Sequence, residues 1–120
     1  MKIRPEQMAA LGKVRLDELV ASIVVMVTTR YPEVAYRRTP AELDALVRGY
    51  VDEAVGFGLT SERGATRYVE YRIEFREGMM RSPEWQWVRD ILSDPALGEA
   101  EKLARIDHLA YGASRPEGWD

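Results

Sequence analysis

The chain has 120 residues, of which 46% are hydrophobic, and its formal net charge is −3 at pH 7. This length predicts one domain with a modest core, and the weak negative charge gives no general electrostatic attraction to nucleic acid or anionic membranes. The absence of cysteine excludes a disulfide framework and thiolate chemistry. Residues 1–20 are charged throughout, unlike a signal peptide. We therefore expect a cytoplasmic protein.

The first predicted helix begins at Pro5, because proline fits the first turn, where its missing N–H would have no partner. Apolar residues then recur at spacings of three and four as far as Tyr31, and Pro32 ends the helix. The apolar run at residues 23–27 also has β-propensity, but the helical spacing continues through it, so we predict helix. The run is far shorter than the ~20 residues of a membrane span, and we expect no membrane association.

Capping signals define the later helices. Thr39 and Glu42 form a capping box around Pro40, and Gly56 and Gly58 supply the permissive backbone for that helix to end. Three further helices are predicted at residues 60–77, 82–93 and 99–113, the last with Leu103, Ile106, Leu109 and Ala110 facing inward. The prediction is all-α: a compact single-domain bundle of about five helices over residues 1–113, followed by a flexible tail at 114–120.

Residues 42–77 have the outline of a helix-turn-helix, with glycine in the turn between two helices. The candidate reading helix carries four arginines and four glutamates, and the helix before it has one arginine against four acidic residues. This pair offers no net phosphate neutralisation, and the third helix has no Asn or Gln to read adenine, although Arg could read guanine. We therefore expect a corner in a bundle and no nucleic-acid binding, and keep a DNA-binding regulator using residues 42–77 as the alternative.

No set of residues predicts catalysis. His108 is the single histidine, and its neighbour Asp107 should not face it, because adjacent helical positions point in different directions. Glu70 and Glu74 share a helix face and could act as an acid and a base, but Arg67 precedes Glu70 by three residues and favours a solvated ion-pair face. No glycine-rich phosphate loop is present. We predict no catalytic residue, no metal site, no cofactor and no enzymatic activity.

Charges on the third helix point to a compensating neighbour. Arg63 and Arg67 lie near its positive end, and Glu70 and Glu74 lie toward its negative end. Both placements oppose the helix dipole, at a cost of a few tenths of a kcal/mol each. We consider either a partner or a neighbouring helix as the compensating group, and the four residues are candidate partner contacts.

Tryptophans in the fourth helix point to an interaction surface. Trp85 and Trp87 are two residues apart, so on one helix they would point about 200° apart, with one inside and the other at least half exposed. Tryptophan and arginine are favoured interface anchors, and Met79, Met80 and Arg81 lie just upstream. We predict a partner-binding surface here. The alternatives are that the Pro32–Arg38 loop and the tail cover both indoles, or that a homo-oligomer buries them.

Four segments in the same order resemble a group of small uncharacterised bacterial proteins, encoded beside effectors in type VI secretion and polymorphic-toxin gene clusters. They are residues 3–8 (IRPEQM), 54–69 around GLTSER, 87–95 ending in DILSDP, and 105–109 around RID. Residues 76–82 depart from the family pattern. The resemblance implies a protein that binds the neighbouring effector, as an immunity protein, chaperone or loading adaptor, and it supplies no catalytic residue.

Overall fold

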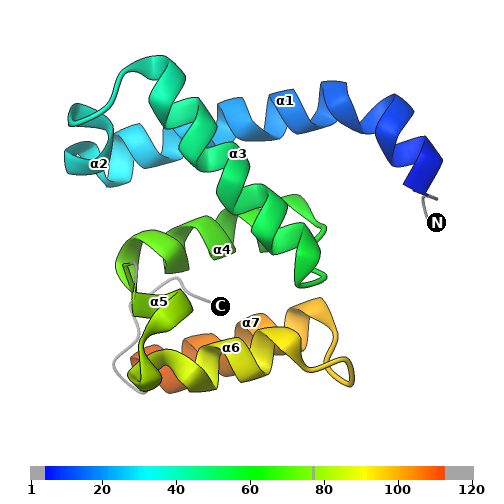
Figure 1. The fold of residues 1–120 in the computed structure, drawn as a ribbon, viewed down its shortest axis with the longest axis vertical. Coiled ribbons are helices and arrows are strands. Elements are labelled where there is room, and N and C mark those ends of the chain that lie inside the picture. Colours follow the sequence, from blue (N-terminus) through cyan, green and yellow to red (C-terminus); the bar gives the residue numbers. More distant parts are fainter. Residues whose placement is uncertain (1–4, 77, 113–120) are drawn as a thin grey trace. The chain divides into compact units, whose positions relative to one another are not determined.

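The computed structural model describes the backbone of residues 5–76 and 78–112, with side chains from residue 15 onward (Figure 1). Within these ranges the elements are all helical, which confirms the all-α fold class. They are α1 (Pro5–Arg30), α2 (Pro32–Tyr36), α3 (Pro40–Gly56), α4 (Glu62–Glu74), α5 (Gly78–Arg81), the 3-10 helix η1 (Pro83–Trp85), α6 (Gln86–Ser93) and α7 (Glu99–Tyr111).

Residue contacts group the chain into two compact units, Met1–Val51 and Asp52–Asp120. The boundary between them falls inside α3. The single domain over residues 1–113 therefore stays a prediction, and the predicted flexible tail at 114–120 lies outside the described residues. The first unit is called the N-terminal unit and the second the C-terminal unit.

In the N-terminal unit, α1 has the predicted bounds and is helical through residues 23–27, as its three/four spacing indicates. In the part of α1 whose side chains are described, from residue 15 onward, the buried residues are Val20, Ile23 and Val27. The segment after Pro32, expected to be a loop, instead forms the short helix α2. An ion pair between Arg48 of α3 and Asp17 of α1, 2.7 Å long, joins the two long helices of this unit.

The capping box at the start of α3 is present as predicted. The Thr39 backbone N–H donates to Glu42 Oε1 at 2.8 Å, and the Glu42 N–H donates to the Thr39 hydroxyl at 3.1 Å. The backbone hydrogen bond from Thr39 is the main reason that the pKa of the Glu42 carboxyl is lowered. A local sequence signal thus fixes the beginning of this helix.

The glycine corner between α3 and α4 is held by the first turn of α7. Gly58 has a φ of +83°, a conformation that glycine adopts without the steric cost of a side chain, and the Ser61 hydroxyl caps α4 by accepting from Gly64 N at 2.9 Å. Lys102 Nζ donates to the Phe57 carbonyl at 2.7 Å, and Glu99 Oε1 accepts from Ser61 N at 3.0 Å. These two α7 side chains were not foreseen from the sequence.

The third predicted helix is shorter than expected. It was placed as far as residue 77, but α4 ends at Glu74 and Arg76 has a left-handed φ of 61°. The chain then forms the short helix α5, which lies between two predicted helices and buries Met79 completely. Arg89 of α6 donates to the carbonyls of Met79 and Ser82 at 2.7 and 3.0 Å. It thus supplies hydrogen bonds to backbone carbonyls in and just after α5.

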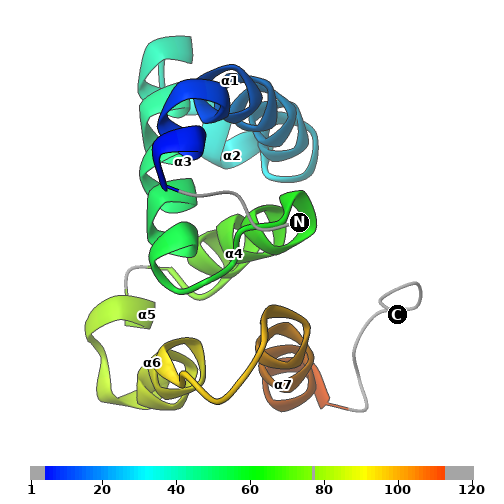
Figure 2. The same ribbon diagram turned by 90° about the vertical axis from the view of Figure 1, so that its right-hand side faces the viewer.

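The fourth predicted helix is divided into η1 and α6, with the change from 3-10 to α geometry at Trp85 and Gln86. After α6, the chain reverses and α7 runs back beside it (Figures 1 and 2). Leu103 and Ile106 of α7 are buried as predicted. The prediction that Leu109 faces inward is wrong, because 60% of it is exposed.

Candidate functional site

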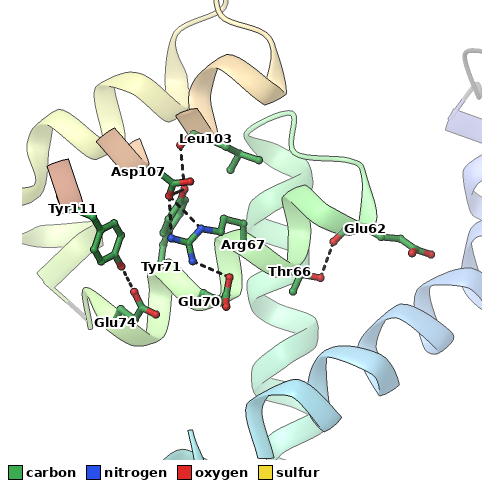
Figure 3. Close-up of polar contacts among 9 residues, drawn as sticks. All are labelled: Glu62, Thr66, Arg67, Glu70, Tyr71, Glu74, Leu103, Asp107 and Tyr111. Atoms are coloured by element: carbon green, nitrogen blue, oxygen red, sulfur yellow. Dashed lines mark hydrogen bonds and ion pairs between the residues drawn. The ribbon is translucent and has the colours of Figure 1, made fainter. Parts of the chain in front are cut away.

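Four polar side chains of α4 and α7 form a buried group, here called the polar cluster: Arg67, Glu70, Tyr71 and Asp107 (Figure 3). Arg67 donates to Glu70 Oε1 at 2.8 Å and to Asp107 Oδ1 at 3.0 and 3.2 Å. The Tyr71 hydroxyl donates to Asp107 Oδ1 at 2.6 Å. One guanidinium therefore pairs with two carboxylates, and one of these comes from the neighbouring helix.

The polar cluster corrects the expectation of a solvated ion-pair face. The side chains of Arg67 and Glu70 are 13% and 8% exposed, and α7 brings Asp107 against the guanidinium of Arg67. Tyr111 of α7 donates a hydrogen bond to Glu74. The neighbouring helix thus supplies the compensation that the reversed helix charges call for, and Arg67, Glu70 and Glu74 are engaged within the C-terminal unit.

Other candidate partner contacts have mixed positions. Met79 is fully buried and offers no surface to a partner, whereas Arg63 and Arg81 are exposed. Met80 is half-buried, and its sulfur lies 3.9 Å from the Tyr68 hydroxyl. The structure does not gather the predicted residues into one patch, because Arg67, Glu70 and Glu74 are engaged within the C-terminal unit and Met79 is buried in the core.

Both tryptophans belong to one aromatic stack. Trp85 stacks on Phe75 with ring centroids 4.5 Å apart, and Phe75 stacks on Tyr71 at 5.4 Å. The rings of Trp85 and Trp87 are 6.2 Å apart and both residues are half-buried. The prediction of opposite directions is wrong, because the helix break at Trp85 removes the regular α-helical rotation between them.

Burial of Tyr71 raises the pKa of its phenol above the ordinary value of 10.0, and the hydrogen bond to Asp107 raises it further, while Arg67 acts in the opposite direction. The folded state therefore holds this proton more tightly than the unfolded state. The resulting stability is fully present below the unfolded pKa and is lost as pH rises above it.

We accordingly expect the free energy of unfolding to fall at pH values above about 10, the unperturbed pKa of tyrosine. Tyr71→Phe should show a shallower alkaline decline, since it has no phenol at this position to titrate. Denaturant unfolding of both proteins across the alkaline range measures this. Parallel declines would show that Tyr71 does not hold its proton as described.

A surface groove of about 600 Å³ lies between α6 and α7. This is here called the α6/α7 groove. Trp87, Asp90 and Ile91 of α6 line one side, and Ala104, Arg105, His108 and Leu109 of α7 line the other. Most of the lining surface is apolar. The exposed Leu109 of α7 thus lies on one wall of the groove, opposite the half-buried Trp87.

The groove includes the single histidine of the chain. His108 is exposed and lines it, whereas Asp107 is turned into the polar cluster, so the two neighbours do not form a dyad, as helical geometry predicts. Among the residues with described side chains, no group of three or more His, Asp or Glu could hold a metal ion.

The walls of the groove are mostly apolar and carry a few charged side chains. Walls of this kind favour contact with another apolar surface.

Trp87 is the groove residue that sequence reasoning selected. The α7 wall was missed, although the spacing of four between Ala104 and His108, and between Arg105 and Leu109, places each pair on one helix face. This spacing identifies one face of α7 but does not predict which helix lies opposite it. Only the reversal of the chain at residues 94–98 reveals the two walls as one groove.

No helix in the described part of the chain combines the length and apolar character that crossing a membrane requires. In comparisons with known protein families, with curated proteins and with solved structures, nothing matches this chain.

Proposed function

We propose that this chain is a non-enzymatic, cytoplasmic bacterial protein that binds an effector protein encoded beside it, and that the α6/α7 groove is its binding surface. The observation that carries this is the apolar groove, in which Leu109 is 60% exposed opposite Trp87. Exposed apolar area beside tryptophan and arginine is typical of protein interfaces. The resemblance to proteins of type VI secretion and toxin clusters supports the choice of an effector as the partner.

The helix-turn-helix alternative receives little support from the arginines of α4, of which only Arg63 is exposed. Arg67 is paired with Glu70 and Asp107, and Arg72 Nε lies 2.8 Å from Glu53 Oε1. Both guanidinium groups are mostly buried within the C-terminal unit. DNA affinity depends on cations that can reach phosphates, so a protein partner is the better account of this surface.

Co-expression with the neighbouring effector, followed by capture of the tagged chain, tests the proposal. We expect a stoichiometric complex. Binding to the toxic domain with loss of toxicity would assign an immunity role, and binding to a targeting or apolar segment with a gain in effector solubility would assign a chaperone or adaptor role. No complex between a folded chain and a soluble effector would overturn the proposal. Light scattering of the chain alone tests whether copies of the chain occupy the groove instead.

Trp87→Ala is expected to weaken effector binding at least ~30-fold, about 2 kcal/mol, because a central aromatic anchor carries a large share of binding energy. Isothermal titration calorimetry measures the change in Kd, and far-ultraviolet circular dichroism verifies the fold. Tyr36→Ala is the matched control, since Tyr36 is an aromatic residue of α2 that is 90% exposed and does not line the groove. The reverse result, with only Tyr36→Ala weakening binding, would move the interface to α2.

A further inference from the structure

We propose that the α6/α7 groove receives an amphipathic helix of the partner, oriented with its acidic side toward α7 and its basic side toward α6. This inference rests on the proposed function and adds the shape and charge pattern of the bound segment. Its evidence is the length of the groove, the spacing of its apolar residues and the distribution of charge between its two walls.

Both walls of the groove are short. The lining residues run from Trp87 to Ile91 on α6 and from Ala104 to Leu109 on α7, so the walls are about 6 and 8 Å long at 1.5 Å per residue. Trp87 and Ile91 lie one turn apart on the α6 wall, and Leu109 lies on the wall opposite. A short helix would lie along these walls, with apolar side chains at i and i+3 or i+4 between them.

The charges differ between the two walls. Arg105 lies on the α7 wall, and Asp90 lies on the α6 wall. Asp90 accepts a hydrogen bond from Gln86 within its own helix. A helix with carboxylates along one side and cations along the other therefore matches the groove only when its acidic side faces α7. Electrostatic complementarity of this kind fixes the orientation of a partner more than it adds affinity.

Arg105 can exchange its present partner at little cost. It pairs with Glu101, one turn earlier on α7, at 3.1 Å, and the two side chains are 55% and 52% exposed. Exposed ion pairs of this kind contribute about 0–1 kcal/mol. A carboxylate of the bound helix that is partly shielded from water in the groove would compete well with Glu101 for the guanidinium.

Synthetic peptides tiling the effector, measured for binding by fluorescence anisotropy, test the inference. We expect one peptide to bind the intact chain, to become helical in circular dichroism and to carry acidic residues along one side. Arg105→Glu should weaken that peptide at least tenfold, and Glu→Lys in the facing peptide position should restore binding to this variant. Arg15→Glu is the matched control, because Arg15 is an exposed arginine of α1 that does not line the groove.

The outcomes separate this inference from the proposed function. In one outcome, the intact effector binds and Trp87→Ala weakens this binding, but no peptide binds or the bound peptide stays non-helical. The proposed function then stands, and the inference of a helical ligand is wrong. If a helical peptide binds but Arg105→Glu has the same effect as Arg15→Glu, the proposed orientation is wrong. If the intact effector does not bind at all, both proposals are overturned.

Discussion

Replacing Arg67 with methionine is expected to lower the free energy of unfolding by about 3–5 kcal/mol, because removing one partner of a buried ion pair leaves uncompensated buried charge. Here two carboxylates, those of Glu70 and Asp107, lose the same guanidinium. Their side chains are only 8% and 14% exposed, so water cannot replace it fully. Chemical denaturation followed by circular dichroism measures the change.

Arg63→Met is the matched control for this prediction. Arg63 lies one turn earlier on α4 and is exposed, so its loss should change stability by no more than about 0.5 kcal/mol. Adding Asp107→Leu to Arg67→Met should recover part of the loss, since it removes one of the stranded charges. Equal effects of Arg67→Met and Arg63→Met would show that the polar cluster does not stabilise the contact between α4 and α7.

The second large effect is expected at the centre of the aromatic stack. Phe75 is 7% exposed and lies between Tyr71 and Trp85, with the ring of Tyr111 6.3 Å away. Phe75→Ala should therefore cost about 3–5 kcal/mol of unfolding free energy, through lost burial and the cavity left behind. It should also change the near-ultraviolet circular dichroism, because the indole of Trp85 loses its stacking partner.

Phe75→Leu provides the comparison, because it retains most of the buried apolar volume and should cost clearly less than Phe75→Ala. Both variants are measured by denaturant unfolding under the same conditions. Equal losses for the two variants would point to a specific requirement for the ring. A loss below about 1 kcal/mol for Phe75→Ala, the average effect of an ordinary substitution, would show that the stack contributes little to the core.

Local signals were sufficient for much of the fold. Pro5 and the capping box at Thr39 marked the beginnings of two helices, because the geometry of a helix start is encoded in adjacent residues. The left-handed Arg76 and the 3-10 turn ending at Trp85 were missed. Both lie beside α5, whose end carbonyls accept hydrogen bonds from Arg89 of α6, and this contact is not encoded in adjacent residues.

The candidate site was less predictable than the fold, because its parts come from different segments. Trp87 could be selected from its residue type and its place in a short helix. Arg105 and Leu109 could be assigned to the groove only from the structure, which places α7 beside α6. The same reason explains why Arg67 was expected to be solvated: Asp107, its partner, lies 40 positions away in the sequence.

Nuclear magnetic resonance of the isotopically labelled chain, with and without unlabelled effector, tests the central claim most directly. The account predicts a complex in which the largest shift changes occur at the Trp87 indole N–H, the Ala104 methyl and the Leu109 methyls, while Val25 and Tyr36 change little. A complex with changes confined to residues 15–50 and none in the α6/α7 groove would contradict it.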